Sequence, residues 1–167
     1  MHRPLPDRSH RPATIGPMSE TPVAREADGA GTLPPGRTPP LDPAEADRIF
    51  RRGVAHFNGA RYWHAHEDWE TLWRAAPEDD RDFYQGLIQV AAGLLHLQRR
   101  NRRGARNKLG EGLERLQHYQ PAHRDLFVNE LVREARRTLD DLDAGYMPYL
   151  IPPVLRFVDT GSDDFSR

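Results

Sequence analysis

The sequence of 167 residues has no cysteine, which excludes disulfide bonds and thiolate sites and suits a reducing compartment. It also lacks a long hydrophobic run. The most apolar stretch, residues 87–97, is interrupted by Gln89 and His96 and is shorter than the roughly 20 residues of a membrane span. The net charge of -1 creates no field that attracts nucleic acid or membranes. No apolar segment follows the arginines near the N-terminus, so a secretory signal is not expected. Together these absences predict a soluble, cytoplasmic protein.

Several catalytic motifs are missing as well. There is no phosphate-binding loop, no dinucleotide fingerprint and no nucleophile elbow. Serine and threonine are scarce in the part of the chain that has helical patterning, which argues against serine-hydrolase chemistry. The segment His66-Glu67-x-x-Glu70 resembles the zinc-protease pattern H-E-x-x-H, but its second histidine is absent. Two histidines of one helix therefore cannot share a metal in that way.

Proline, in contrast, is abundant at the start of the chain. Residues 1–41 contain nine of the fifteen prolines, and their apolar residues follow no helical or strand period. Such a segment buries too little surface to offset its ordering entropy, so we predict a disordered tail. Met18 opens a second stretch that could begin the protein. A folded domain is expected over residues 42–158 and a flexible end over residues 159–167.

The folded domain is predicted to be all-α, a compact bundle of about five helices with short connections. Asp42, Pro43 and Glu45 form a helix-start signal, and Gly59 and Gly145 are placed to end helices in the left-handed conformation. The apolar residues recur at three and four. The expected helices cover residues 42–58, 61–74, 79–100, 103–119 and 123–143. No stretch alternates for long enough to predict a strand, and residues 146–157 should lie extended over the bundle.

The second and third helices carry a candidate polar site. At 100° per residue, His66 and Glu70 fall among the aromatic residues of the second helix, where they need partners. Gln85, Gln89 and His96 form a stripe on the third helix, made shallow by Ala92 and Gly93. Because a short loop joins the two helices, we expect this stripe to meet His66 and Glu70. His64, Glu67, Asp68, Thr71 and Arg74 fall on the opposite, polar side of the second helix.

Three interpretations of this cluster stay open. In the first interpretation, the cluster is a buried hydrogen-bond network that fixes helix register, and the protein is a scaffold that contacts other proteins. Alternatively, it binds a divalent metal through His66, Glu70 and His96, with Glu67 at the rim, or a small ligand. The expected ligand-binding residues are His66, Glu67, Glu70, Trp73, Gln85, Gln89 and His96. In the third interpretation, the stripe on the third helix is a solvated face. If the protein is an enzyme, we expect a metal-dependent hydrolase in which Glu67 or Glu70 acts as general base.

Two further features were considered as binding surfaces. The aromatic residues Tyr62, Trp63, Trp69, Trp73 and Tyr84 are more typical of a core than of a ligand pocket. A basic cluster surrounds the turn between the third and fourth helices (Arg99, Arg100, Arg102, Arg103, Arg106 and Lys108). It lacks nearby aromatic residues for base stacking, so nucleic acid is the less favoured partner. A small molecule, a protein or a second copy of the chain is left as the partner.

Two sequence blocks resemble those of a known family. Residues 57–74 read FNGARYWHAHEDWETLWR and residues 83–92 read FYQGLIQVAA, followed by His96 and by NRRGA at residues 101–105. This pattern is similar to domain-of-unknown-function family 309 over about residues 43–145. The resemblance implies a small all-helical bundle in a bacterial or archaeal cytoplasm and implies no activity. The matching motif positions are His66, Glu67, Glu70, Trp73, Gln85, Gly86, Gln89, His96 and Asn101. The proline-rich N-terminus departs from the compact family pattern.

Overall fold

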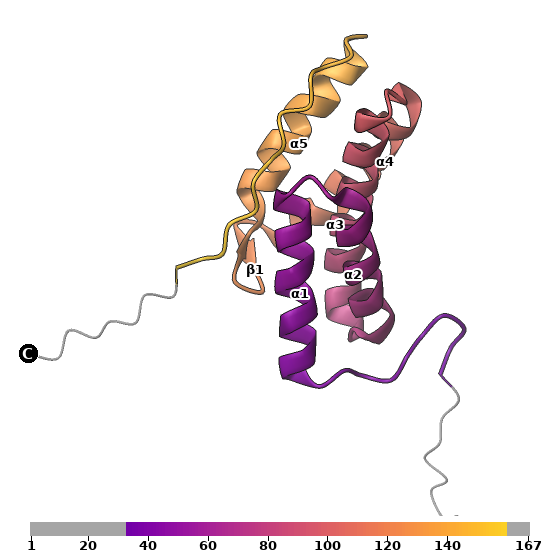
Figure 1. Cartoon of the computed structure of the whole chain (residues 1–167), viewed down its shortest axis with the longest axis vertical. Helices are drawn as coiled ribbons and strands as arrows, with labels where there is room; N and C mark the ends of the chain where they lie inside the picture. The colour runs from indigo at the N-terminus through magenta and orange to yellow at the C-terminus, as the bar shows by residue number, and fades with distance from the viewer. Residues whose placement is uncertain (1–32, 160–167) are drawn as a thin grey trace, which may run out of the picture. The chain divides into compact units, whose positions relative to one another are not determined.

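The computed structural model describes residues 33–159. Residues 1–32 and 160–167, which include much of the expected N-terminal tail and of the expected C-terminal end, lie outside the described residues. Within the described part, five α-helices account for most of the chain (Figure 1). They are α1 (Pro43–Asn58), α2 (Tyr62–Ala75), α3 (Glu78–Gln98), α4 (Arg102–Leu116) and α5 (Val128–Asp143). The all-α bundle expected from the periodicity is confirmed.

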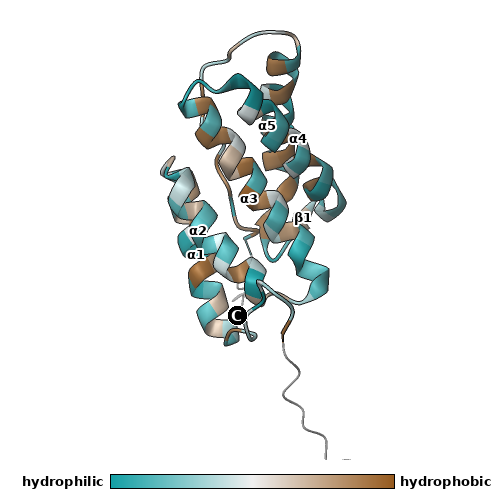
Figure 2. Cartoon of the chain, turned by 90° about the vertical axis from the view of Figure 1, so that its right-hand side faces the viewer, coloured by the Kyte–Doolittle hydropathy of each residue, from teal (hydrophilic) through white to brown (hydrophobic). Residues whose placement is uncertain are grey.

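α3 is the central helix of the bundle. It packs against both α2 and α4, while α1 packs on α2 and α5 packs on α4. In Figure 2, α3 lies between α1 and α2 on one side and α4 and α5 on the other. Buried residues occur all around α3, from Phe83 and Tyr84 to Leu97, whereas the other helices bury one face each. A helix that is apolar all round belongs in the interior, which explains why residues 87–97 form the most apolar stretch.

The first helix starts and ends close to its expected limits. The Asp42 carboxylate accepts hydrogen bonds from the backbone N–H groups of Ala44 and Glu45, and Pro43 occupies the first turn. At the other end, the expectation of a left-handed Gly59 is wrong. Gly59 has a φ of -84°, and Ala60 takes the positive φ of 54° instead. Gly145, with a φ of 96°, does adopt a positive φ after α5.

Residues 122–127 differ most from the expected secondary structure. We expected the last helix to begin at His123, but α5 begins at Val128, after a short hairpin of β1 (Ala122–His123) and β2 (Leu126–Phe127). Arg124 and Asp125 have φ values of 48° and 59°, and this left-handed pair cannot continue a right-handed helix. The fourth helix also ends early: α4 stops at Leu116, and a 3-10 turn, η1 (Gln117–Tyr119), follows.

The C-terminal segment lies extended on the bundle, as expected. It runs along α5 in Figure 1, and residues 151–154 and Arg156 line a surface pocket together with Glu130, Arg133 and Glu134 of α5. The Asn58 side chain holds this segment to the end of α1 through both the nitrogen and the oxygen of its amide group. Its Nδ2 donates to the Leu155 carbonyl at 2.9 Å, and its Oδ1 accepts from the Leu155 N–H at 2.8 Å. No helix within residues 33–159 has the length and apolar character needed to cross a bilayer.

Candidate functional site

His66 and Glu70 lie one turn apart on α2, and both side chains are partly buried. The His66 Nδ1 is 3.9 Å from the Glu70 Oε2, which is too long for a hydrogen bond, and this buried nitrogen has no hydrogen-bond partner in the described part of the chain. The His66 ring instead stacks on Trp63, with 5.4 Å between the ring centroids. The Glu70 carboxylate accepts from the Arg74 guanidinium at 2.6 Å. The two side chains are therefore neighbours but are bound to different groups.

The stripe on α3 faces a different helix from the one we expected. Gln89 is buried, and its Nε2 donates to the Glu111 carboxylate of α4 at 2.8 Å. The His96 ring packs on Gly104 of α4, and its Nδ1 lies 3.1 Å from the Asn101 side-chain nitrogen. Gly93 does permit close approach, since a Cβ there would lie 2.7 Å from the Leu109 Cγ, but Leu109 also belongs to α4.

The proposed three-ligand metal set of His66, Glu70 and His96 is therefore not assembled. His96 is engaged at the junction of α3 and α4, and Glu70 is engaged by Arg74 on α2. Within residues 33–159, no three His, Asp or Glu side chains gather in a way that could hold a metal ion. The reason is that the small residues of the stripe admit α4, so α4 covers the face that was assigned to α2.

Two of the expected ligand-binding residues, Trp73 and Gln85, do lie together. They line a surface groove of about 480 Å³ with four charged residues from α3 and α4. We call this the Trp73 groove; its lining is Trp73, Glu78, Arg81, Asp82, Gln85 and Arg115. The Arg81 guanidinium stacks over the Trp73 ring at 4.3 Å from the centroid. Trp73 thus differs from Tyr62, Trp69 and Tyr84, which are core residues as expected.

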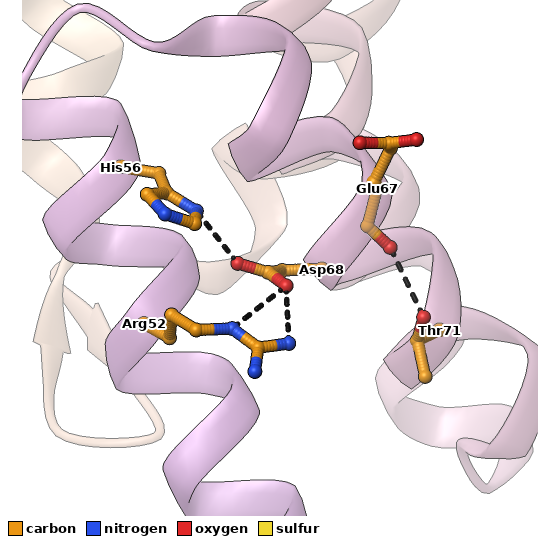
Figure 3. Close-up of polar contacts among 5 residues, drawn as sticks. All are labelled: Arg52, His56, Glu67, Asp68 and Thr71. Carbon is orange, nitrogen blue, oxygen red and sulfur yellow. Dashed lines mark hydrogen bonds and ion pairs between the residues drawn. The ribbon is translucent and has the colours of Figure 1, made fainter.

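A second polar cluster centres on Asp68, which the helical-wheel count placed on the solvated side of α2 (Figure 3). The Asp68 carboxylate is buried because α1 covers that side. Its Oδ1 accepts from the Arg52 Nε and Nη2 at 3.0 and 2.6 Å, and its Oδ2 lies 2.9 Å from the His56 Nδ1. The hydrogen bond to Asp68 raises the pKa of Arg52 above the ordinary value of an arginine. The side chains of Arg52, His56 and Asp68 thus join α1 to α2.

The remaining polar candidates are less enclosed. Glu67 is exposed, and Figure 3 shows its carboxylate pointing away from the Asp68 cluster. In the basic cluster, the Arg102 side chain donates to the Leu142 carbonyl and Arg106 pairs with Asp143. Two of its arginines therefore hold α4 to the end of α5, which leaves fewer of them to face a phosphate backbone.

The motif residues fall within a segment that a family model matches. Residues 50–107 match the model of Domain of unknown function (DUF309). The resemblance seen in the two sequence blocks is thereby confirmed for this segment. The DUF309 match runs from the second half of α1 to the first turns of α4, so it contains Asp68, His66, Glu70, Trp73, Gln85 and Gln89. No curated protein matches the sequence. The DUF309 description names no activity.

Proposed function

We propose that this domain binds a small organic anion in the Trp73 groove. The observation that carries the proposal is the state of its two arginines. Within residues 33–159, the buried Arg115 Nε has no hydrogen-bond acceptor, and the Asp82 carboxylate is 3.5 Å away. Arg81 likewise lies 3.8 Å from Glu78. Both separations exceed a hydrogen bond. Each guanidinium group makes one long hydrogen bond to a backbone carbonyl, Arg81 to Trp73 at 3.4 Å and Arg115 to Glu111 at 3.5 Å, and its other donors stay available to a ligand.

The positions of the charges favour an anion. The arginine side chains lie inward, with 18% of Arg81 and 35% of Arg115 exposed. The acidic side chains lie in solvent, with 86% of Glu78 and 74% of Asp82 exposed. Because water screens the acids more strongly than the arginines, the interior of the groove is positive although its formal charges cancel.

Uncharged parts of the groove supply shape and orientation. The Trp73 ring forms a flat wall on which Arg81 stacks, and the half-buried Gln85 amide makes no hydrogen bond within residues 33–159. A concave site that combines an apolar wall with a few convergent polar groups is typical of small-molecule binding.

The geometry favours this proposal over a metal site, a hydrolase and a scaffold without a ligand. A divalent metal at His66 and Glu70 would have two protein ligands rather than three. A hydrolase needs a carboxylate near a held water, but Glu70 is paired with Arg74 and Glu67 is exposed. A scaffold without a ligand leaves the Arg115 donor unexplained.

The test uses the full chain and one matched pair of probes, benzoate and the uncharged benzyl alcohol. Each is titrated while the indole N–H signal of Trp73, assigned with Trp73→Phe, is followed by NMR. We expect benzoate to move this signal saturably and benzyl alcohol to move it at least tenfold less effectively. Replacing Arg115 with methionine should weaken benzoate binding roughly 10–100-fold, the loss of one charge-assisted hydrogen bond. Arg133→Met, at an exposed position of α5, is the control and should leave benzoate binding unchanged.

Three results would contradict the proposal. They are equal binding of both probes, benzoate binding that survives Arg115→Met, and no response of Trp73 to benzoate at all. A separate titration with Zn²⁺ distinguishes the metal hypothesis, which requires stoichiometric binding that is lost in His66→Ala.

A further inference from the structure

A second cavity, of about 300 Å³, lies on the other side of the junction between α2 and α3. Its walls come from the segment before α1, from the start of α1, from the end of α2 and from the start of α3. We call it the Tyr84 pocket. Most of its lining is aliphatic, and its polar groups are Asp80, Tyr84 and Arg124. The lining residues are Pro40, Leu41, Pro43, Ala46, Leu72, Ala75, Ala76, Pro77, Asp80, Tyr84 and Arg124.

The outer wall of this pocket is held in place by hydrogen bonds. The Thr38 N–H donates to the Arg74 carbonyl at 3.0 Å, and the Arg37 side chain donates to the Ala76 carbonyl at 2.6 Å. These bonds fix residues 37–41 across the end of α2. Proline at positions 40 and 43 restricts the backbone further. The pocket is therefore built by the fold and is not a gap beside a loose segment.

The polar end of the pocket offers one free hydrogen-bond donor. Tyr84 is buried, and its hydroxyl makes no hydrogen bond within residues 33–159. Burial raises the pKa of Tyr84 to about 12, so the hydroxyl keeps its proton at neutral pH and can donate. Beside it, the Asp80 carboxylate is already occupied by the His123 Nε2 at 2.7 Å and by the Arg124 Nη1 at 2.8 Å.

We propose that the Tyr84 pocket binds a small, uncharged, mainly aliphatic molecule that carries one acceptor oxygen, such as a ketone. The aliphatic walls take the hydrocarbon part, and the Tyr84 hydroxyl donates to the oxygen. The charges argue for an uncharged ligand because Asp80 and Arg124 neutralise each other. A carboxylate or an ammonium group would enter this partly dehydrated site without a free counter-charge, and its desolvation would not be repaid.

The probes are three eight-carbon molecules of nearly equal size: octan-2-one, octanoate and octylammonium. Binding to the full chain is measured by ligand-observed NMR and by calorimetry at pH 7. We expect octan-2-one to bind at least tenfold more tightly than either ion. Ala46→Phe should fill the pocket and weaken ketone binding at least tenfold, whereas Ala44→Phe, an exposed position on the same helix, should leave it unchanged. Tyr84→Phe should weaken it by about 2–10-fold, the loss of one hydrogen bond.

Thermal unfolding of each variant checks that it is folded, and Tyr84→Phe provides a test that does not depend on Ala46→Phe folding. Equal binding of all three probes, tighter binding of either ion, or equal effects of Ala46→Phe and Ala44→Phe would overturn the proposal. So would ketone binding that is unchanged by Tyr84→Phe. This proposal is independent of the Trp73 groove, because Arg115→Met should leave ketone binding unaffected and Ala46→Phe should leave benzoate binding unaffected.

Discussion

Replacing Asp68 with alanine tests whether the charged cluster between α1 and α2 stabilises the fold. The carboxylate accepts two hydrogen bonds from Arg52 and lies within hydrogen-bond distance of His56. Hydrogen bonds to charged groups contribute about 1.5–3 kcal/mol each, and breaking a fully buried ion pair costs about 3–5 kcal/mol. The Arg52 side chain is 60% exposed and can be rehydrated, which reduces its part. We therefore expect the free energy of unfolding to fall by about 2–3 kcal/mol.

Urea unfolding at 25 °C and pH 7 measures this loss, and Asp47→Ala is its matched control. Asp47 also accepts from an arginine, Arg51 at 2.8 Å, but both side chains are about half exposed. An exposed pair one turn apart on a helix contributes about 0.3–0.5 kcal/mol. If Asp68→Ala destabilises the protein no more than Asp47→Ala does, burial does not strengthen the cluster and our reasoning is wrong.

Three further predictions concern packing and buried hydroxyl groups. Gly112→Ala should lower the free energy of unfolding by about 1–3 kcal/mol, because its Cβ would lie 2.8 Å from the Val90 Cγ2 and 3.0 Å from backbone atoms of α3. Gly110→Ala, on the same helix with nothing within 4 Å, should raise it by about 0.5–1 kcal/mol, and equal effects in urea unfolding would contradict this account. Tyr62→Phe should leave stability at pH 7 unchanged or raise it by up to about 1 kcal/mol, because the buried Tyr62 hydroxyl has no hydrogen-bond partner among residues 33–159; a clear loss of stability would contradict this. Burial raises the pKa of Tyr62 and of Tyr84 from 10.0 to about 12, so their contribution to the free energy of unfolding is complete below pH 10 and is lost as the pH rises to 12. This loss should be smaller in the Tyr62→Phe/Tyr84→Phe variant. An unchanged loss would show that these two tyrosines do not cause it.

Helix periodicity was enough to predict the fold class, because each helix carries a regular apolar stripe. The stripe of α1, with Ile49, Gly53, Val54 and Phe57, is buried as the spacing indicates. Turn geometry was not predictable in the same way. The hairpin at residues 122–127 uses Arg124 and Asp125 at positive φ, where an asparagine or a glycine is the usual signal. A left-handed Ala60 beside an available Gly59 is likewise set by the packing of the chain around it.

The periodicity of one helix predicts which residues share a face, but it does not predict which neighbouring helix covers that face. Angular counting correctly placed Gln85, Gln89 and His96 on one face of α3, but it does not say which neighbour covers that face. A stripe with Ala92 and Gly93 admits any helix, and α4 occupies it through Leu109. For Asp68, the same count indicated the polar side of α2, but α1 covers that side, and Gly53 of α1 permits a close approach of the two helices. A Cβ there would lie 2.4 Å from the Trp69 Nε1, so the missing side chain lets α1 approach the side of α2 that carries Asp68.

The central position of α3 connects these observations. Because α3 is covered by α2 on one side and by α4 on the other, its polar residues reach the surface at the ends of those contacts. In the first turns of α3, Asp80 and Tyr84 line the Tyr84 pocket, and Arg81 and Gln85 line the Trp73 groove. Residues 80 and 84, like residues 81 and 85, are one turn apart, and the two pairs differ by 100° around the helix. One helix end thus separates an aliphatic pocket from a groove lined by charged residues, and each can be altered by a substitution outside the other.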